Sequence, residues 1–232
     1  MNKKTNANKV SYVKPFFSRT YKKLKSEALN YTDLILKIEN AKTLEELQSI
    51  YANTEFGKYK FDKNKYPNFD FTISKEEIRS LEDVNAIGKE GQLLHEYFRD
   101  GKKLTTIEKL LYSYIWKRGE LNRFPSMISG IKGDDYMRNT GQVLNQFGKY
   151  LSNDNFNEPI VDQHVIRAFR VCIEDNESST SGTVNYRIIQ DYRHWLLNLV
   201  NKKNLKNKKL AIAIIDKIMF SIGKSLKQQH NR

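Results

Sequence analysis

The sequence predicts an all-α protein, and three observations support this fold class. Apolar residues recur at three- to four-residue spacing through most of the chain, the periodicity of amphipathic helices. Capping signals precede several of these segments, whereas convincing strand patterns are absent. Hydrophobic residues make up 39% and charged residues 29% of the 232 residues, which is typical of a folded globular protein rather than a disordered chain.

The first part of the chain is expected to contain a flexible basic arm followed by helices. Residues 1–15 are polar and basic without periodicity, and aromatic and apolar residues over 16–24 indicate a first short helix. Thr43 and Ser74 are each followed three residues later by Glu, so both predict the capping box of a further helix. Residues 54–73 between them are expected to form a loop.

A third capping box, at Thr105, predicts a strongly amphipathic helix that ends at Gly119. Its apolar residues share one face and are expected to be buried: Ile107, Leu110, Leu111, Tyr114 and Ile115. The aromatic residues of this helix also alternate with Lys117 and Arg118, a pattern seen on base-stacking surfaces. We favour the interpretation of core aromatics with exposed cations.

Two helices and a glycine-containing turn are expected to follow. A short helix near 124–129 leads into Gly130-Ile131-Lys132-Gly133, and a helix over about 134–151 comes next. The long helices near the end of the chain are predicted at 184–201 and about 208–227. We expect an N-terminal helical region over 16–104 and a core over 105–232, with one continuous domain over 16–232 as the alternative.

The most informative stretch surrounds Asp162, which stands where a helix should begin. Asp is among the best N-cap residues, because its carboxylate accepts hydrogen bonds from unpaired backbone N–H groups of the first turn. Val161 and Ile166 then have the spacing of a hydrophobic staple. Val165, Phe169 and Cys172 form a buried stripe, and Arg167 beside it is expected to need solvent or a phosphate.

Two segments carry a resemblance to a known family. They are Val161-Asp162-Gln163-His164-Val165-Ile166-Arg167 and Tyr192-Arg193-His194-Trp195-Leu196-Leu197. The first resembles the Val-Asp-Thr-His-(Val/Ile)-x-Arg segment of the helix-hairpin-helix DNA glycosylases, the endonuclease III superfamily. The second is similar to the His-His-Trp-Leu-Ile-Leu helix of the same family. The resemblance covers roughly residues 105–200.

The resemblance implies a helix-hairpin-helix glycosylase-like fold in which Asp162 is the catalytic carboxylate facing a DNA cleft. The residues expected to contact nucleic acid are Gly130, Lys132, Gly133, Arg138, His164 and Arg167, with Trp195 as a base-stacking candidate. The alternatives are a core position for Trp195, a surface position without DNA contact for His164, which we favour, and a role for Asp162 that is limited to capping its helix.

The predicted hairpin departs from the family pattern. One extra residue separates its two glycines, and Asp134 and Asp135 follow it, which suits the helix dipole but repels phosphate. An ordinary helix–turn–helix corner therefore remains an alternative. The lysine that forms a Schiff base in bifunctional members is replaced by Met137 or Asp135, depending on the alignment, so hydrolysis without strand cleavage is expected.

Charge and cysteine content limit the classes of partner and cofactor that can be expected. Residues 1–26 hold eight Lys and Arg and no acidic residue, and residues 201–232 hold nine Lys and Arg against Asp216 alone. Basic ends of this kind suit nucleic acid, although they also serve solubility, and the resemblance to the glycosylases implies DNA more than RNA. One cysteine excludes an internal disulfide and a four-cysteine iron–sulfur cluster. The four histidines show no metal-ligand spacing, so no metal or cofactor is expected.

The sequence contains neither a leader-like apolar segment nor a membrane-spanning run, so we expect a cytoplasmic protein. The predicted function is base removal from DNA by hydrolysis of the N-glycosidic bond. The alternative is a non-catalytic helical module of the same fold that binds nucleic acid or protein. A protein of anti-phage or mobile-element type that uses the fold differently is a third possibility.

Overall fold

A computed structural model describes residues 31–56, 59, 71–99, 101, 104–134, 141–152, 158–173, 184–203, 205 and 207–230. Within these ranges the regular elements are all helical, and the only β-type pairings are isolated bridges at Phe56–Tyr59 and Ile87–Leu93. The all-α prediction is therefore confirmed for this part of the chain. The predicted arm over 1–15 and the helix over 16–24 lie outside the described residues.

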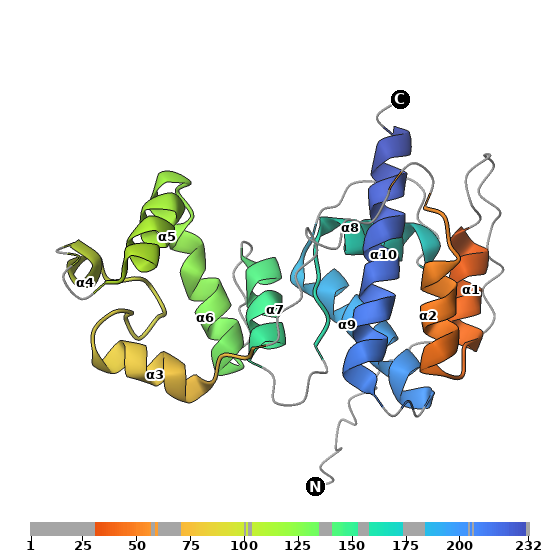
Figure 1. Ribbon diagram of the computed structural model, residues 1–232, viewed down its shortest axis with the longest axis horizontal. Coiled ribbons are helices and arrows are strands. Elements are labelled where there is room, and N and C mark those ends of the chain that lie inside the picture. The colour runs from red at the N-terminus through yellow and green to blue at the C-terminus, as the bar shows by residue number, and fades with distance from the viewer. Residues whose placement is uncertain are drawn as a thin grey trace, which may run out of the picture.

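The helices form two groups that lie side by side (Figure 1). We call the first group the terminal unit, since it contains helices from both ends of the described chain. Its helices are α1 (Tyr31–Asn40), α2 (Leu44–Ala52), α8 (Gln163–Cys172), α9 (Tyr186–Lys202) and α10 (Lys208–His230). The second group, the inserted unit, lies between them in the sequence. It contains α3 (Lys75–Asp83), α4 (His95–Arg99), α5 (Thr106–Lys117), the 3-10 helix η3 (Leu121–Arg123), α6 (Phe124–Lys132) and α7 (Gln142–Leu151).

The terminal unit is organised around α10, which packs against α8, α2 and α9. One large core joins α1, α2, α8, α9 and α10, and it includes the fully buried Phe169, Tyr192 and Leu196. This arrangement differs from the boundary expected at 104/105, because α1 and α2 pack with the C-terminal helices. Residues far apart in the sequence therefore build one unit.

The inserted unit has a much smaller core. The cluster at its centre consists of four buried isoleucines, Ile78, Ile87, Ile128 and Ile131. Its main contact is the α6–α7 crossing, where the backbones approach closely at two glycines. A Cβ atom on Gly130 would lie 2.0 Å from the Asn145 carbonyl oxygen, and one on Gly148 would lie 2.1 Å from that of Met127. Only glycine permits this crossing.

The local start signals are confirmed. Ser74 and Thr105 both form complete capping boxes, with Glu77 and Glu108 returning a side-chain bond to the cap backbone. Thr43 caps α2 through Glu46 N–H, but Glu46 returns its bond to the N–H of Lys42 instead of Thr43.

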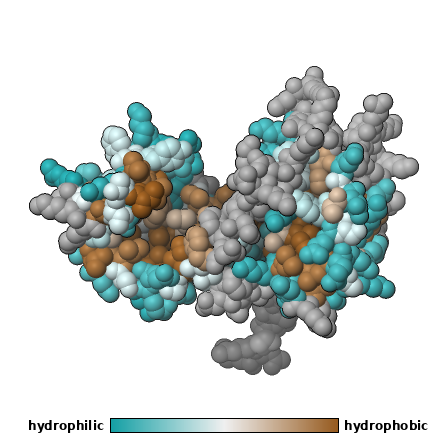
Figure 2. All heavy atoms as spheres, in the orientation of Figure 1, coloured by the Kyte–Doolittle hydropathy of each residue, from teal (hydrophilic) through white to brown (hydrophobic). Residues whose placement is uncertain are grey.

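The predicted buried face of α5 is wrong. Its large apolar side chains are more than half exposed: Ile107, Leu110, Leu111, Tyr114 and Trp116. The helix makes its ring contact with α4 through Tyr112, which stacks on Phe98 at a centroid distance of 4.4 Å. Figure 2 shows hydrophobic side chains, in brown, at the surface of this unit. Periodicity identified which residues share a face, but no described element covers that face.

Candidate functional site

Asp162 begins α8 as its N-cap, with extended backbone angles of φ −132° and ψ 179°. Its Oδ1 accepts hydrogen bonds from the N–H groups of His164 at 2.7 Å and Val165 at 2.9 Å. The side chain is half-buried, and the second oxygen, Oδ2, makes no hydrogen bond with the described residues. The predicted cap is confirmed, and it uses only one of the two carboxylate oxygens.

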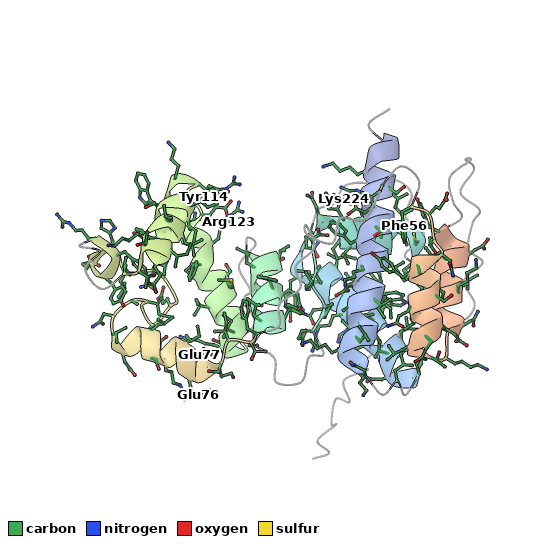
Figure 3. The ribbon with its side chains drawn as sticks, in the orientation of Figure 1. Phe56, Glu76, Glu77, Tyr114, Arg123 and Lys224 are labelled. Atoms are coloured by element: carbon green, nitrogen blue, oxygen red, sulfur yellow. The ribbon has the colours of Figure 1, made fainter. Side chains whose placement is uncertain are left out.

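The surroundings of Asp162 act on its charge in opposite directions. Burial raises the pKa of this carboxyl, while the two N–H bonds of the cap and the positive charges of Lys224 and Arg167 oppose the rise. Lys224 lies on α10 beside α8, as Figure 3 shows. The carboxylate therefore stands in a partly desolvated place between a helix N-terminus and two cations.

His164 and Arg167 are buried rather than presented to a ligand. The Arg167 side chain donates to His164 Nδ1 at 2.8 Å and to the Gly223 carbonyl oxygen at 3.3 Å. Burial and neighbouring cations lower the pKa of His164 to about 4, which suits an imidazole that accepts from a guanidinium. This position is incompatible with the predicted contact of these two side chains with nucleic acid. Their structural role is to hold α8 against α10.

The same crossing explains why a glycine is needed on α10. A Cβ atom on Gly223 would lie 1.9 Å from the His164 carbonyl oxygen, so the two helices touch through their backbones. The partner of Arg167 is therefore 56 residues away in the sequence. No local pattern around residue 167 could have revealed it.

The predicted hairpin residues are also occupied by internal contacts. Gly130 is buried within α6 at the crossing with α7, so it is not part of a phosphate-binding turn. Gly133 ends α6 in the left-handed conformation, at φ 83°. Lys132 pairs with Glu82 and donates to the Lys89 carbonyl oxygen at 3.1 Å. Arg138 lies outside the described residues.

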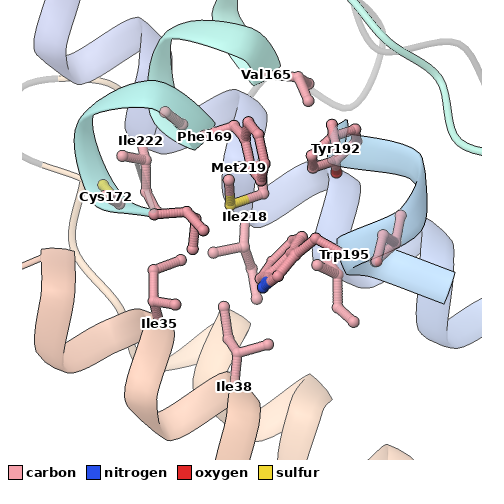
Figure 4. Close-up of a cluster of buried hydrophobic side chains, with 14 of the residues drawn as sticks. Ile35, Ile38, Val165, Phe169, Cys172, Tyr192, Trp195, Ile218, Met219 and Ile222 are labelled. Atoms are coloured by element: carbon pink, nitrogen blue, oxygen red, sulfur yellow. The ribbon is translucent and has the colours of Figure 1, made fainter. Parts of the chain in front are cut away.

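Trp195 is a core residue, as Figure 4 shows. Its side chain is only 7% exposed, and its ring lies 6.0 Å from Phe169 and 5.8 Å from Tyr192 between centroids. The predicted base-stacking role would need an accessible ring face, so the alternative of a core position is the correct one.

A second carboxyl group, which the sequence did not identify as a site residue, belongs to Asp216 and interacts electrostatically with Asp162. Asp216 of α10 is 2% exposed, and it accepts hydrogen bonds from the Tyr192 hydroxyl at 2.5 Å and the Ile160 N–H at 2.9 Å. The sequence does contain a feature that indicates a buried role for Asp216. It is the one acidic residue of residues 201–232 and shares a helix face with Ile212 and Met219. A lone acid on such a face requires partners.

The segment before Asp162 is held by charged and polar side chains of both units. Arg193 binds Glu158 through two nitrogens, at 2.6 Å and 2.5 Å. Gln146 of α7 donates to Glu158 at 3.0 Å and to the Pro159 carbonyl oxygen at 3.2 Å. The approach to Asp162 is therefore tied to α7, α9 and α10.

Features of a metal site and of a membrane-spanning helix are absent from the same described ranges. These ranges contain no cluster of three or more His, Cys, Asp or Glu side chains that could hold a metal ion. None of their helices combines the length and hydrophobicity needed to cross a membrane. One surface cavity, of about 320 Å³, is lined by residues of α1 and the segment after α2, and none of the predicted site residues lines it.

Comparisons of the chain with protein-family models, with curated proteins and with solved structures found no match. The candidate site must therefore be interpreted from its own geometry and from the two short segments that suggested a family.

Proposed function

We propose that the protein binds nucleic acid and removes a base by hydrolysing its N-glycosidic bond, in the manner of the helix-hairpin-helix DNA glycosylases, with Asp162 as the assisting carboxylate. The observation that carries the proposal is that the two oxygens of this carboxylate differ in their hydrogen bonding. Oδ1 is fixed by two backbone N–H groups, while Oδ2 makes no hydrogen bond with the described residues, and the positive charge of Lys224 acts on the carboxylate.

The chemistry requires a fixed negative charge near the sugar. Breaking the bond between C1′ and the base passes through an oxocarbenium-like state, which a nearby carboxylate stabilises. The base leaves with the bonding electron pair, and water adds to C1′, with Asp162 able to accept the proton that water loses. A base inside a duplex would first be flipped out of the stack. Lys224 and the basic ends of the chain would meet phosphates.

The test is a panel of oligonucleotides that carry damaged or modified bases, incubated with the wild type and with Asp162→Asn. Asparagine caps a helix as well as aspartate does, so this variant keeps the fold and removes the charge. Base removal is expected from at least one oligonucleotide, and the rate should fall by about 100-fold or more in Asp162→Asn.

Asp162→Ala provides the matched control for capping. It removes charge and cap together and is expected to lower stability by about 1 kcal/mol, whereas Asp162→Asn leaves stability nearly unchanged. Base removal that proceeds at the wild-type rate in Asp162→Asn would exclude the carboxylate from the mechanism.

A non-catalytic nucleic-acid-binding module is the second candidate, and one observation favours it. Lys132, Gly130, His164 and Arg167, which the first candidate would use to contact DNA, are engaged in contacts within the protein, and this weighs against the catalytic arrangement of the glycosylases. A module of this kind would bind oligonucleotides with an affinity that falls steeply with salt and would release no base. Lys224→Gln should then weaken binding uniformly across sequences and reduce the salt slope by about one phosphate contact.

A further inference from the structure

The extended segment over 158–161 directly precedes Asp162 in the chain. Hydrogen bonds hold this segment at three successive residues. Glu158 is bound by Arg193, the Pro159 carbonyl oxygen accepts from Gln146, and the Ile160 N–H donates to Asp216. The bond to Asp216 is the last of the three before the helix begins. It lies two residues from the candidate catalytic carboxylate.

Asp216 itself is an unusual anchor. Burying a carboxyl group away from water costs free energy of folding unless its oxygens accept hydrogen bonds. Both oxygens do: Oδ1 accepts from the Tyr192 hydroxyl of α9, and Oδ2 accepts from the Ile160 N–H. An apolar residue would fill this place on α10 without these bonds, but it would leave Ile160 N–H without an acceptor.

We propose that Asp216 is a positioning residue, which together with Tyr192 fixes the backbone at Ile160 and thereby sets the place of Asp162 at the start of α8. The catalytic meaning of this placement rests on the proposed function. The positioning itself does not, because it concerns the geometry of the cap.

The electrostatics of the two carboxyl groups agree with this arrangement. Burial raises the pKa of Asp216 to about 7, the bonds from Tyr192 and Ile160 oppose the rise, and the charge of Asp162 adds to it. The groups that face Asp216 are therefore Tyr192 from α9, the N–H of the segment over 158–161, and Asp162 at the start of α8. Arg167 and Lys224 favour the charged form of Asp162.

Amide hydrogen exchange, resolved by NMR, tests the positioning role in Asp216→Asn. Asparagine has one acceptor oxygen for the two donors, the Tyr192 hydroxyl and the Ile160 N–H, so the anchor and then the cap should be loosened. We expect exchange at the amides of Ile160, His164 and Val165 to become about tenfold faster. Amides in the middle of α10 should keep their wild-type rates. Unchanged rates at the three amides would overturn the proposal.

Ser225→Ala is the matched control on the same helix. It removes a buried hydrogen bond from the Tyr31 hydroxyl, at 2.7 Å, without touching the segment over 158–161. Its effect should be spread over α1 and α10 and should spare Ile160. If Asp216→Asn and Ser225→Ala accelerate the same amides to the same degree, Asp216 is only a general structural residue and the proposal fails.

Tyr192→Phe keeps the proposal testable if Asp216→Asn does not fold. It keeps the ring and the carboxyl group but removes one donor, so the pKa of Asp216 should rise, as followed by the ¹³C shift of its carboxyl carbon. Exchange at Ile160 should accelerate less than in Asp216→Asn. An Asp216 pKa that is unchanged in Tyr192→Phe would overturn the pairing.

Activity separates this inference from the proposed function. Where the wild type removes a base, Asp216→Asn should lower kcat by about tenfold or more with little change in KM, because a small misplacement of the carboxylate affects the chemical step. A wild type that removes no base would end the proposed function, while the exchange rates would still decide whether Asp216 positions Asp162.

Discussion

The terminal and inserted units are both built from amphipathic helices, yet they bury their apolar faces to very different extents. In the terminal unit α8, α9 and α10 place almost every large apolar residue in one shared core. In the inserted unit four isoleucines are buried, and α5 contributes no buried residue. The difference teaches that helix formation and helix burial are separate outcomes. Capping boxes start α3 and α5 as reliably as Asp162 starts α8, but only α8 is enclosed by neighbours.

Both units nevertheless depend on glycine where two helices cross. Gly223 permits α10 to touch α8, and Gly130 with Gly148 permits α6 to touch α7. The chain has two tryptophans, Trp195 in α9 and Trp116 in α5, so each unit carries its own fluorescent reporter. The unfolding of each unit can therefore be followed separately by the fluorescence of its own tryptophan.

The largest expected effect comes from placing a methyl group at a crossing. In Gly223→Ala and Gly130→Ala the new Cβ would meet a backbone carbonyl oxygen at 1.9 Å and 2.0 Å, so the helices must move apart. Each variant should lose at least about 4 kcal/mol from the free energy of unfolding of its own unit. Denaturant titration of Trp116→Phe and Trp195→Phe backgrounds measures this for each unit.

Gly88→Ala is the control for these variants, since its new Cβ would meet only the flexible end of Gln92. Its cost should be below about 1 kcal/mol. If Gly130→Ala destabilises the Trp195-reported transition as strongly as the Trp116-reported one, the two units unfold together and the division between them is wrong.

A smaller effect is expected from shortening leucines of the two units. Leu196 is 0% exposed in the terminal core, whereas Leu110 on α5 is 63% exposed. Leu196→Ala should lower the free energy of unfolding by about 3 kcal/mol, because it leaves a cavity. Leu110→Ala should change it by less than about 0.5 kcal/mol. Equal losses in urea titrations of the two variants would mean that the face of α5 is covered in solution.

The last expected effect is a pH dependence confined to the terminal unit. The pKa of Asp216 is raised from 3.8 to about 7 in the folded chain, so the unfolded chain releases this proton first. The stability contributed by the neutral carboxyl is present below about pH 4 and is lost as pH rises towards 7. Relative to Asp216→Asn, the wild type should therefore lose stability over this window, by at most about 1.4 kcal/mol per pH unit.

His164 acts in the opposite direction over nearly the same window. Its pKa is lowered from 6.5 to about 4 in the folded chain, so it opposes folding as pH falls through this range. The wild-type profile should be flatter than that of Asp216→Asn, which keeps the His164 contribution but lacks the opposing contribution of Asp216. Unfolding followed by Trp195 fluorescence at several pH values measures both slopes, and the transition reported by Trp116 should not share the difference.

The parts of the structure that were predictable from the sequence are the local ones. Ser74, Thr105 and Asp162 cap their helices because the atoms they bind lie within three residues. The burial of Arg167 depends on Gly223, and that of Asp216 depends on Tyr192 and Ile160, all on other elements. A pattern read along the chain contains no information about such partners. The internal contacts of Lys132 with Glu82 and Lys89, and of Gly130 with the Asn145 backbone, could not be predicted for the same reason.

The hydrogen bond between Tyr31 and Ser225 joins residues that are 194 positions apart, across the core of the terminal unit. At a synthesis rate of roughly 5–20 residues per second, α1 waits about 10–40 s on the ribosome before its partner on α10 has been made. The inserted unit contains all the contacts of its own small core and can assemble during that interval. The apolar faces of α1 and α2 lack their partner α10 throughout it, so chaperone binding in the cell should include these two early helices.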